Sequence, residues 1–129
     1  MRILVVDDMA LTRRVLVNML KSFGYDTIFE CENGESALKL LFNSDSKIDL
    51  LITDWIMPGI DGLTLAKLIR SNKNTQNLPI IMLTIIDDKE RIVEAYQTRI
   101  DDYILKPFTA EVIKSKVENV LKNHNIINK

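Results

Sequence analysis

Five short apolar runs alternate with amphipathic segments along this chain, and this alternation constrains the fold more than any other feature. The runs span residues 3–6, 27–29, 50–52, 80–83 and 103–105. Three of them are continuously apolar, which is typical of strands covered on both faces. Strict alternation of strand and helix predicts parallel strands joined by right-handed crossovers. The expected fold is therefore α/β, with an open, doubly wound sheet of five parallel strands.

The segments between the runs carry apolar residues at helical spacing, and polar residues stand where helices would begin. In the fourth of these segments the apolar stripe is Ile92, Val93 and Tyr96. Asn33 and Thr109 are predicted N-caps. Asp87 has the spacing of a capping box with the glutamate three residues later, and is predicted to begin the fourth helix.

Composition excludes several classes of protein. Seventeen Lys and Arg against 18 Asp and Glu leave a net charge of −1, which gives no electrostatic footprint for direct nucleic-acid binding. The single cysteine allows no internal disulfide and favours a reducing, cytoplasmic setting. No apolar run reaches the ~18 residues of a membrane span, so no membrane insertion is expected. The length predicts one domain, residues 1–122, followed by a tail or the start of a linker at 123–129.

Polar residues collect where four of the five predicted strands end. Asp7 and Asp8 follow the first strand, Asp54 the third, Thr84 the fourth and Lys106 the fifth. In doubly wound sheets, ligands bind at the carboxyl ends of the strands. We therefore expect three carboxylates, a hydroxyl and an ammonium group at one edge of the sheet.

The chemistry of this set favours a divalent cation and a phosphoryl group. Clustered carboxylates raise one another's pKa unless a cation intervenes, and Mg²⁺ prefers such oxygen ligands. An ionised Asp can attack phosphorus, while a metal and a Lys neutralise the developing charge. Taken singly, Asp8 is equally well interpreted as a helix N-cap, and Asp54 as a loop carboxylate. Jointly, the residues predict a magnesium-dependent acidic phosphate site.

Four motifs in this order resemble the receiver domain of two-component response regulators, close in form to single-domain chemotaxis receivers. They are Val-Val-Asp-Asp at 5–8, Asp-Trp-Ile-Met-Pro-Gly-Ile-Asp-Gly at 54–62, Leu-Thr at 83–84 and Tyr-Ile-Leu-Lys-Pro-Phe at 103–108. The resemblance covers residues 2–122. It implies a flavodoxin-like (βα)5 fold with strand order 2-1-3-4-5.

The resemblance also implies a phosphorylation-activated signalling switch in a phosphorelay. Asp54 would accept a phosphoryl group from a sensor histidine kinase or a phosphotransfer protein. Mg²⁺, with Mn²⁺ as an alternative, would be bound by Asp8, Asp54 and the backbone carbonyl of Ile56, with Asp7 assisting through water. No other cofactor is expected. Such a protein is a phosphoacceptor that catalyses its own phosphorylation and dephosphorylation rather than an enzyme acting on other substrates.

Three further residues have implied roles in switching. Lys106 would contact the phosphoryl group, and the peptide bond that follows it is commonly cis in this family. Thr84 would be the switch hydroxyl, and Tyr103 the rotating aromatic side chain; alternatively, Tyr103 is only a half-buried strand residue. The face formed by the fourth helix, fifth strand and fifth helix would then regulate an output protein or a covalently attached effector domain.

The sequence departs from the family pattern at a few positions. Ile85 follows the switch Thr where a small residue is usual, and it is expected to crowd the phosphoryl entrance or the path of Tyr103. Arg99 stands where Gly is usual, so we expect the fourth helix to end without a left-handed residue. Ile56 and Ile86 are expected to flank the site and, being apolar, to slow loss of the phosphoryl group. Arg13 and the arginine after it are interpreted as a solvated face, with kinase docking as the alternative.

Two other functions share parts of this pattern. A metal-dependent aspartyl-phosphate phosphatase would need a second Asp two residues after the nucleophile, where this chain has Ile56. A flavodoxin-like cofactor binder would need a hydroxyl- and Gly-rich phosphate loop after the first strand, where Asp7 and Asp8 would repel an anion.

Overall fold

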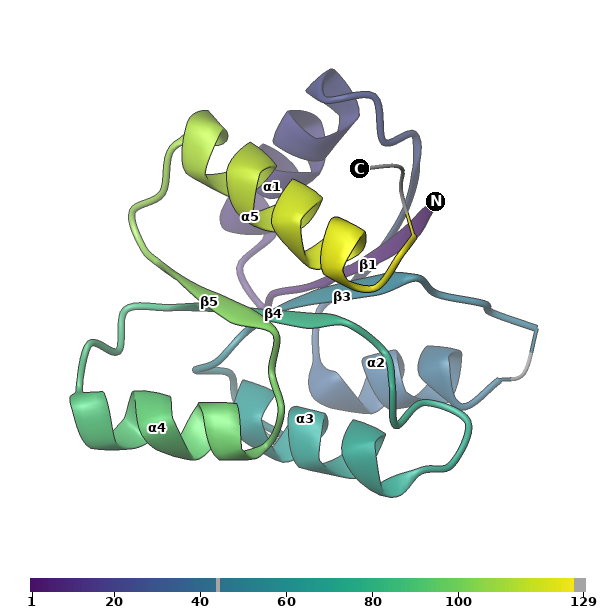
Figure 1. The fold of residues 1–129 in the computed structure, drawn as a ribbon, viewed down its shortest axis with the longest axis vertical. Coiled ribbons are helices and arrows are strands. Elements are labelled where there is room, and N and C mark those ends of the chain that lie inside the picture. Colours follow the sequence, from purple (N-terminus) through teal and green to yellow (C-terminus); the bar gives the residue numbers. More distant parts are fainter. Residues whose placement is uncertain (44, 127–129) are drawn as a thin grey trace.

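The computed structural model describes residues 1–43 and 45–126 as strands and helices in strict alternation (Figure 1). The strands are β1 (Arg2–Val6), β2 (Thr27–Cys31), β3 (Leu50–Asp54), β4 (Ile80–Thr84) and β5 (Asp102–Leu105). The helices are α1 (Ala10–Ser22), α2 (Gly34–Leu41), α3 (Gly62–Ser71), α4 (Lys89–Gln97) and α5 (Ala110–Asn123). The predicted tail, residues 123–129, lies partly outside the described residues; its first residue is the last of α5.

The strands form one parallel sheet in the order β2-β1-β3-β4-β5. This confirms the predicted fold class and strand order. Helices α1 and α5 cover one face of the sheet, and α2, α3 and α4 cover the other (Figure 1). Because the chain runs outward from β1 to β2 and then returns to β3, the order reverses between β1 and β3. A crevice is expected at the carboxyl ends of these two strands.

Alternate side chains of the central strands enter two separate apolar layers. In β1, Leu4 and Val6 pack with the α2, α3 and α4 side, whereas Ile3 and Val5 pack with α1 and α5. Strands β3 and β4 are buried along their whole length. Both faces of these strands are covered, which explains why their sequences are apolar runs rather than alternating ones.

Helix ends follow the sequence in two cases and differ in a third. Asn33 and Thr109 cap α2 and α5 as predicted, each accepting a hydrogen bond from a first-turn backbone N–H. The prediction for Asp87 was wrong, because the cap of α4 is Asp88. The Asp88 carboxylate accepts a hydrogen bond from the Glu90 N–H at 3.0 Å, and this bond caps α4 without a capping box between Asp87 and Glu90.

The end of α4 also differs from expectation. Arg99 adopts a left-handed conformation with φ of 66°, although a residue with a Cβ is disfavoured there. Its N–H donates to the Tyr96 carbonyl at 2.8 Å, and its own carbonyl accepts from Nη2 of Arg70 at 2.8 Å. The Arg70 side chain is only 9% exposed, so a buried guanidinium holds this turn in place.

The surface of α4 is less buried than its apolar stripe predicts. Ala95 is its one buried residue, while Val93 and Tyr96 are 47% and 41% exposed. Among the helices in the described part of the chain, none has the length and apolarity needed to cross a bilayer.

Candidate functional site

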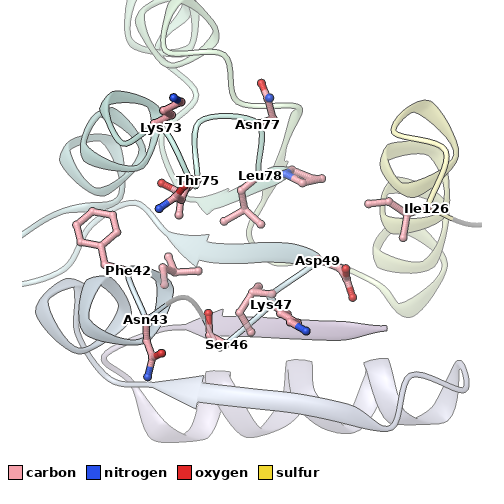
Figure 2. Close-up of a pocket in the computed structure, with 14 residues that line it drawn as sticks. Phe42, Asn43, Ser46, Lys47, Asp49, Lys73, Thr75, Asn77, Leu78 and Ile126 are labelled. Atoms are coloured by element: carbon pink, nitrogen blue, oxygen red, sulfur yellow. The ribbon is translucent and has the colours of Figure 1, made fainter.

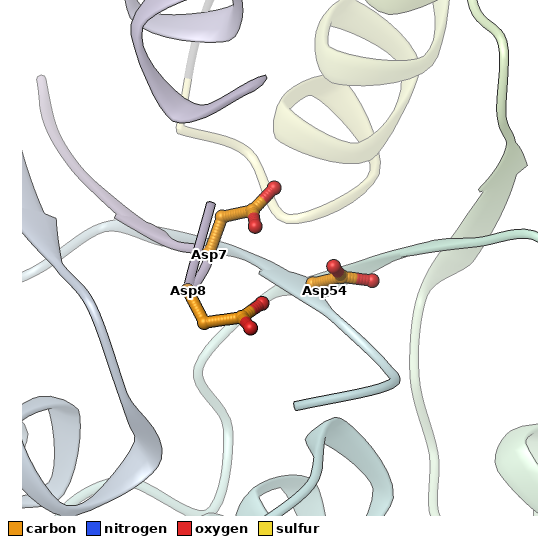
Figure 3. A group of neighbouring side chains, drawn as sticks. All are labelled: Asp7, Asp8 and Asp54. Carbon is orange, nitrogen blue, oxygen red and sulfur yellow. The ribbon is translucent and has the colours of Figure 1, made fainter. Parts of the chain in front are cut away.

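Three carboxylates meet at the carboxyl ends of β1 and β3 (Figure 3). Asp7 and Asp8 lie just after β1, and Asp54 is the last residue of β3. One carboxylate oxygen from each lies within 4.8 Å of the others. Asp7 and Asp54 are buried, at 1% and 7% exposure, whereas Asp8 is exposed. The group therefore has one open side, toward solvent.

Strand register explains why these residues meet. Val6 pairs with Thr53 across β1 and β3. The next residues on the two sides, Asp7 and Asp54, therefore lie side by side. Thr84 pairs with Leu105 across β4 and β5, which brings Lys106 to the same edge. The backbone N–H of Lys106 donates to the Thr84 carbonyl at 2.9 Å. Four strands thus deliver the predicted groups to one edge of the sheet.

The start of α3 packs directly beneath this edge. The Gly62 N–H donates to the Trp55 carbonyl at 2.7 Å. A Cβ at Gly62 would lie 2.8 Å from Cα of Trp55 and 2.7 Å from Sδ of Met82, and it would collide with the Asp54 carbonyl oxygen. A glycine is required here because the backbones approach so closely.

Lys106 extends across the carboxylate cluster. Its Nζ donates to Oδ2 of Asp54 at 3.0 Å and lies 3.6 Å from Oδ2 of Asp7. The Lys106–Pro107 peptide bond is cis, as the family resemblance implies. The ammonium group therefore partly neutralises a pair of buried carboxylates.

Burial and Lys106 act in opposite directions on Asp54. Desolvation raises the pKa of Asp54, the hydrogen bond and charge of Lys106 lower it, and the charge of Asp7 raises it. The net pKa is above the ordinary value. One ammonium group is therefore insufficient compensation for the carboxylates gathered here.

The donor set fits a hard divalent cation. Oδ1 of Asp7 accepts a hydrogen bond from the Met9 N–H at 2.9 Å. Its Oδ2 is buried and has no hydrogen-bond partner among the described residues. A buried, unpartnered carboxylate oxygen beside two further carboxylates matches the all-oxygen coordination that Mg²⁺ prefers.

Thr84 and Tyr103 have different surroundings. Thr84 is fully buried, and its Oγ1 accepts a hydrogen bond from the Ile86 N–H at 2.8 Å. The hydroxyl proton is thus available for a second bond. Tyr103 is half-buried on β5, and its ring meets Tyr96 of α4 edge-on with centroids 5.9 Å apart.

The apolar residues that follow Asp54 and Thr84 differ in exposure. Ile56 is 51% exposed and Ile85 is 68% exposed. Ile86 is only 7% exposed and packs in the apolar layer with Ala95, so the expectation that it flanks the site was wrong. Its position next to the start of α4 turns its side chain into the core instead.

Sequence reasoning missed the role of Arg13. Its side chain is only 16% exposed, so the interpretation as a solvated face was wrong. Nη1 donates to the Asp7 carbonyl at 2.6 Å, and Nε donates to Oε1 of Glu30 at 3.0 Å. The available signal was its place one helical turn after the acidic pair, where an arginine can fold back over the loop.

A separate cavity lies away from the carboxylate cluster. It has a volume of about 540 Å³ and lies near the amino ends of β3 and β4, where Asp49 and Pro79 contribute to its lining (Figure 2). Its wall mixes apolar side chains such as Phe42 with polar ones such as Lys47 and Lys73. None of the predicted site residues lines it, since they lie at the carboxyl ends of the strands.

Comparisons with known proteins agree with this geometry. The model of the response regulator receiver domain matches residues 3–118. Chemotaxis protein CheY of Pseudomonas aeruginosa is 37% identical over 97% of this chain and 99% of that protein. Chemotaxis protein CheY1 of Helicobacter pylori is 43% identical over 94% of this chain and 97% of that protein.

Solved structures show the same fold. A response regulator receiver protein from Pseudomonas putida superimposes with a TM-score of 0.82 and 31% identity, over 92% of this chain and 98% of that one. Chemotaxis protein CheY4 of Vibrio cholerae gives a TM-score of 0.84 and 27% identity, over 93% and 98%.

Proposed function

The chain belongs to the response regulator receiver domain family, and from this membership we propose that phosphorylation of Asp54 switches it between two states. Receiver domains of this kind are phosphoacceptor signalling proteins. The observation that carries the assignment is the contact between Nζ of Lys106 and Oδ2 of Asp54 beside the unpartnered Oδ2 of Asp7. Phosphoryl transfer to an Asp requires a carboxylate that accepts the phosphoryl group, an oxygen that can bind a divalent cation, and a fixed positive charge.

The transfer forms one bond and breaks one. An oxygen of Asp54 attacks phosphorus of a phosphohistidine on a sensor kinase or phosphotransfer protein. The nitrogen–phosphorus bond breaks, and its electron pair leaves with the imidazole. Asp8, Asp54, the Ile56 carbonyl and, through water, Asp7 would hold Mg²⁺ or Mn²⁺, which when bound neutralises charge on the phosphoryl oxygens. Lys106 stays in place and pairs with the new anion.

Switching follows from the new charge. Phosphorylation adds about −1.5 to −2 charges and three strong acceptor oxygens. The Thr84 hydroxyl donates a hydrogen bond to one of these oxygens, and Tyr103 turns into the space that Thr84 leaves. The face of α4, β5 and α5 then favours one state, because the phosphoryl group contacts the two states differently.

The output of the switch is a protein contact. The partner on the α4, β5 and α5 face is a separate output protein or a covalently attached effector, and the chain contacts neither nucleic acid directly nor membrane. The relatives named above are chemotaxis proteins. We place the protein in the cytoplasm, with residues 1–122 as the receiver and residues 123–129 as a tail or linker start.

The experiment that tests this function is intact mass measurement after incubation with acetyl phosphate and Mg²⁺. We expect a mass increase of one phosphoryl group, which is absent in Asp54→Ala and absent when the metal is chelated. Asp87→Ala is the matched control, since it removes an exposed Asp away from the cluster. Hydrolysis of acetyl phosphate without an adduct would instead favour a phosphatase.

A further inference from the structure

Hydrogen bonds hold Asp7 at two backbone atoms and at one side-chain oxygen. Its N–H donates to the Cys31 carbonyl of β2 at 3.2 Å. Its carbonyl accepts from Nη1 of Arg13 at 2.6 Å, and its Oδ1 accepts from the Met9 N–H at 2.9 Å. The one polar atom of Asp7 without a hydrogen-bond partner among the described residues is Oδ2, which lies 3.6 Å from Nζ of Lys106.

Arg13 connects this loop to two secondary-structure elements at once. It lies in the first turns of α1, its Nε donates to Glu30 on β2, and its Nη1 donates to the Asp7 carbonyl. A planar guanidinium can donate in two fixed directions, so each bond restricts the other. The low exposure of the side chain reduces competition from water for both bonds.

We propose that Arg13 is a positioning residue for the cation site, and this inference rests on the proposed function. By fixing the Asp7 carbonyl, Arg13 sets the direction in which Asp7 and Asp8 leave β1 toward Asp54. A loop already in the binding geometry loses less conformational freedom when a cation binds. Residues that orient metal ligands in this way typically contribute about 10- to 100-fold to metal affinity.

Arg14 provides the matched control. Its Nη1 donates to Oε2 of the same Glu30 at 2.8 Å, but its side chain is 59% exposed. Neutralising Arg14 therefore removes one positive charge and one bond to Glu30. It leaves the bond from Arg13 to the Asp7 carbonyl intact.

The test is a titration of the full chain with Mg²⁺ alone, followed by calorimetry or by fluorescence of Trp55. Trp55 is the only tryptophan, is 4% exposed, and directly follows Asp54. We expect Arg13→Gln to raise the dissociation constant of Mg²⁺ on the order of tenfold. Arg13→Lys should give an intermediate value, because an ammonium group cannot span both acceptors with the same geometry. Arg14→Gln should stay within about twofold of the parent chain.

A second measurement separates positioning from general damage to the fold. The initial rate of phosphorylation by acetyl phosphate should fall in Arg13→Gln at low Mg²⁺ and return to the parent value at saturating Mg²⁺. Equal Mg²⁺ affinities for Arg13→Gln, Arg13→Lys and the parent would overturn the proposal. So would equal losses in Arg13→Gln and Arg14→Gln, or a rate that stays low at saturation.

The same titration distinguishes this inference from the proposed function. If the parent chain binds no Mg²⁺, both fail together. If the parent binds Mg²⁺ and accepts the phosphoryl group while Arg13→Gln behaves identically, the proposed function stands and the role of Arg13 is wrong.

Discussion

Asp54 carries its charge where water reaches it poorly. Its pKa is raised because burial outweighs the support from Lys106. The folded chain therefore holds the Asp54 proton more tightly than the unfolded chain does. As pH rises from the unfolded pKa, about 3.9, to the folded value, the unfolded chain releases its proton first. Stability is lost over that interval, and the loss is complete above the folded pKa.

Asp54→Asn should accordingly stabilise the metal-free protein. We expect the free energy of unfolding at pH 7 to rise on the order of 1 kcal/mol, because a partly desolvated charge is replaced by a neutral amide. The gain should shrink as pH falls toward 3.9. Urea unfolding in the presence of a chelator, with Asp87→Asn as control, measures both effects. An Asp54→Asn protein no more stable than the control at pH 7 would contradict this account.

Ile56 controls access of water to the phosphoryl group in our proposal. It follows Asp54 by two residues, and its exposed side chain offers no hydrogen bond to an attacking water. Ile56→Asn should speed loss of the phosphoryl group on the order of tenfold, below the full effect of a catalytic acid or base. The decay of the phosphorylated mass after removal of acetyl phosphate measures this. Val93→Asn, an exposed change on α4, should leave the decay unchanged.

The connection from β3 to α3 tolerates no side chain at its closest point. Gly62→Ala would push a Cβ into the backbone of Asp54 and Trp55. We expect the free energy of unfolding to fall by about 3 kcal/mol, as in other overpacked cores. Gly24→Ala is the control, because Gly24 has positive φ but open space around its Cβ position. That variant should lose about 1 kcal/mol from the left-handed conformation alone. Equal losses in urea unfolding would show that the close approach is not limiting.

At the scale of elements, the sequence was informative where a local pattern decides the structure. The apolar runs predicted every strand, and Asn33 and Thr109 predicted two helix starts. Predictions from the sequence were wrong where a contact with a distant side chain determines the local structure. Arg99 is left-handed and its carbonyl accepts a hydrogen bond from Arg70 of α3, a contact that has no signature near Arg99. Asp87 and Asp88 are adjacent carboxylates, and only the structure shows that Asp88 accepts the first-turn N–H.

The candidate site shows the same division. Parallel strands end at one edge, so residues that follow them converge, and the sequence predicted which carboxylates and which lysine would meet. The contact from Arg13 to the Asp7 carbonyl was missed, because the place of Arg13 soon after the acidic pair allows this contact but does not fix the direction of its side chain. Roles for Thr84 and Tyr103 stay predictions.

At the scale of the whole molecule, one carboxylate joins the three elements of the proposed output face. Oδ1 of Asp102 accepts hydrogen bonds from Oη of Tyr96 on α4 at 3.2 Å, from Nζ of Lys116 on α5 at 3.0 Å, and from the Tyr103 N–H of β5 at 2.8 Å. Burial and the charge of Asp102 raise the pKa of Tyr96 to about 12. The Tyr96 hydroxyl therefore keeps its proton, and can donate, over the whole physiological range of pH.

Tyr96→Phe should loosen this face without removing the ring contact with Tyr103. Loss of one hydrogen bond to a carboxylate typically costs about 1.5 kcal/mol. We expect backbone amides of α4 to exchange with deuterium roughly tenfold faster, while Mg²⁺ affinity is unchanged. Tyr25→Phe, a change in the connection between α1 and β2, is the control. Unchanged exchange in α4 would show that Asp102 does not restrain it through Tyr96.

The long sequence separation of the site residues has a consequence for protein synthesis. Lys106 and Asp54 are 52 residues apart, and they meet only because β5 adds to the edge of a sheet already begun by β1. A ribosome delivers the chain from its N-terminus, so all three aspartates emerge well before Lys106 is made. A nascent chain therefore presents the aspartates to a phosphoryl donor without the lysine. On the proposed role of Lys106, the site is complete only once β5 has joined the sheet.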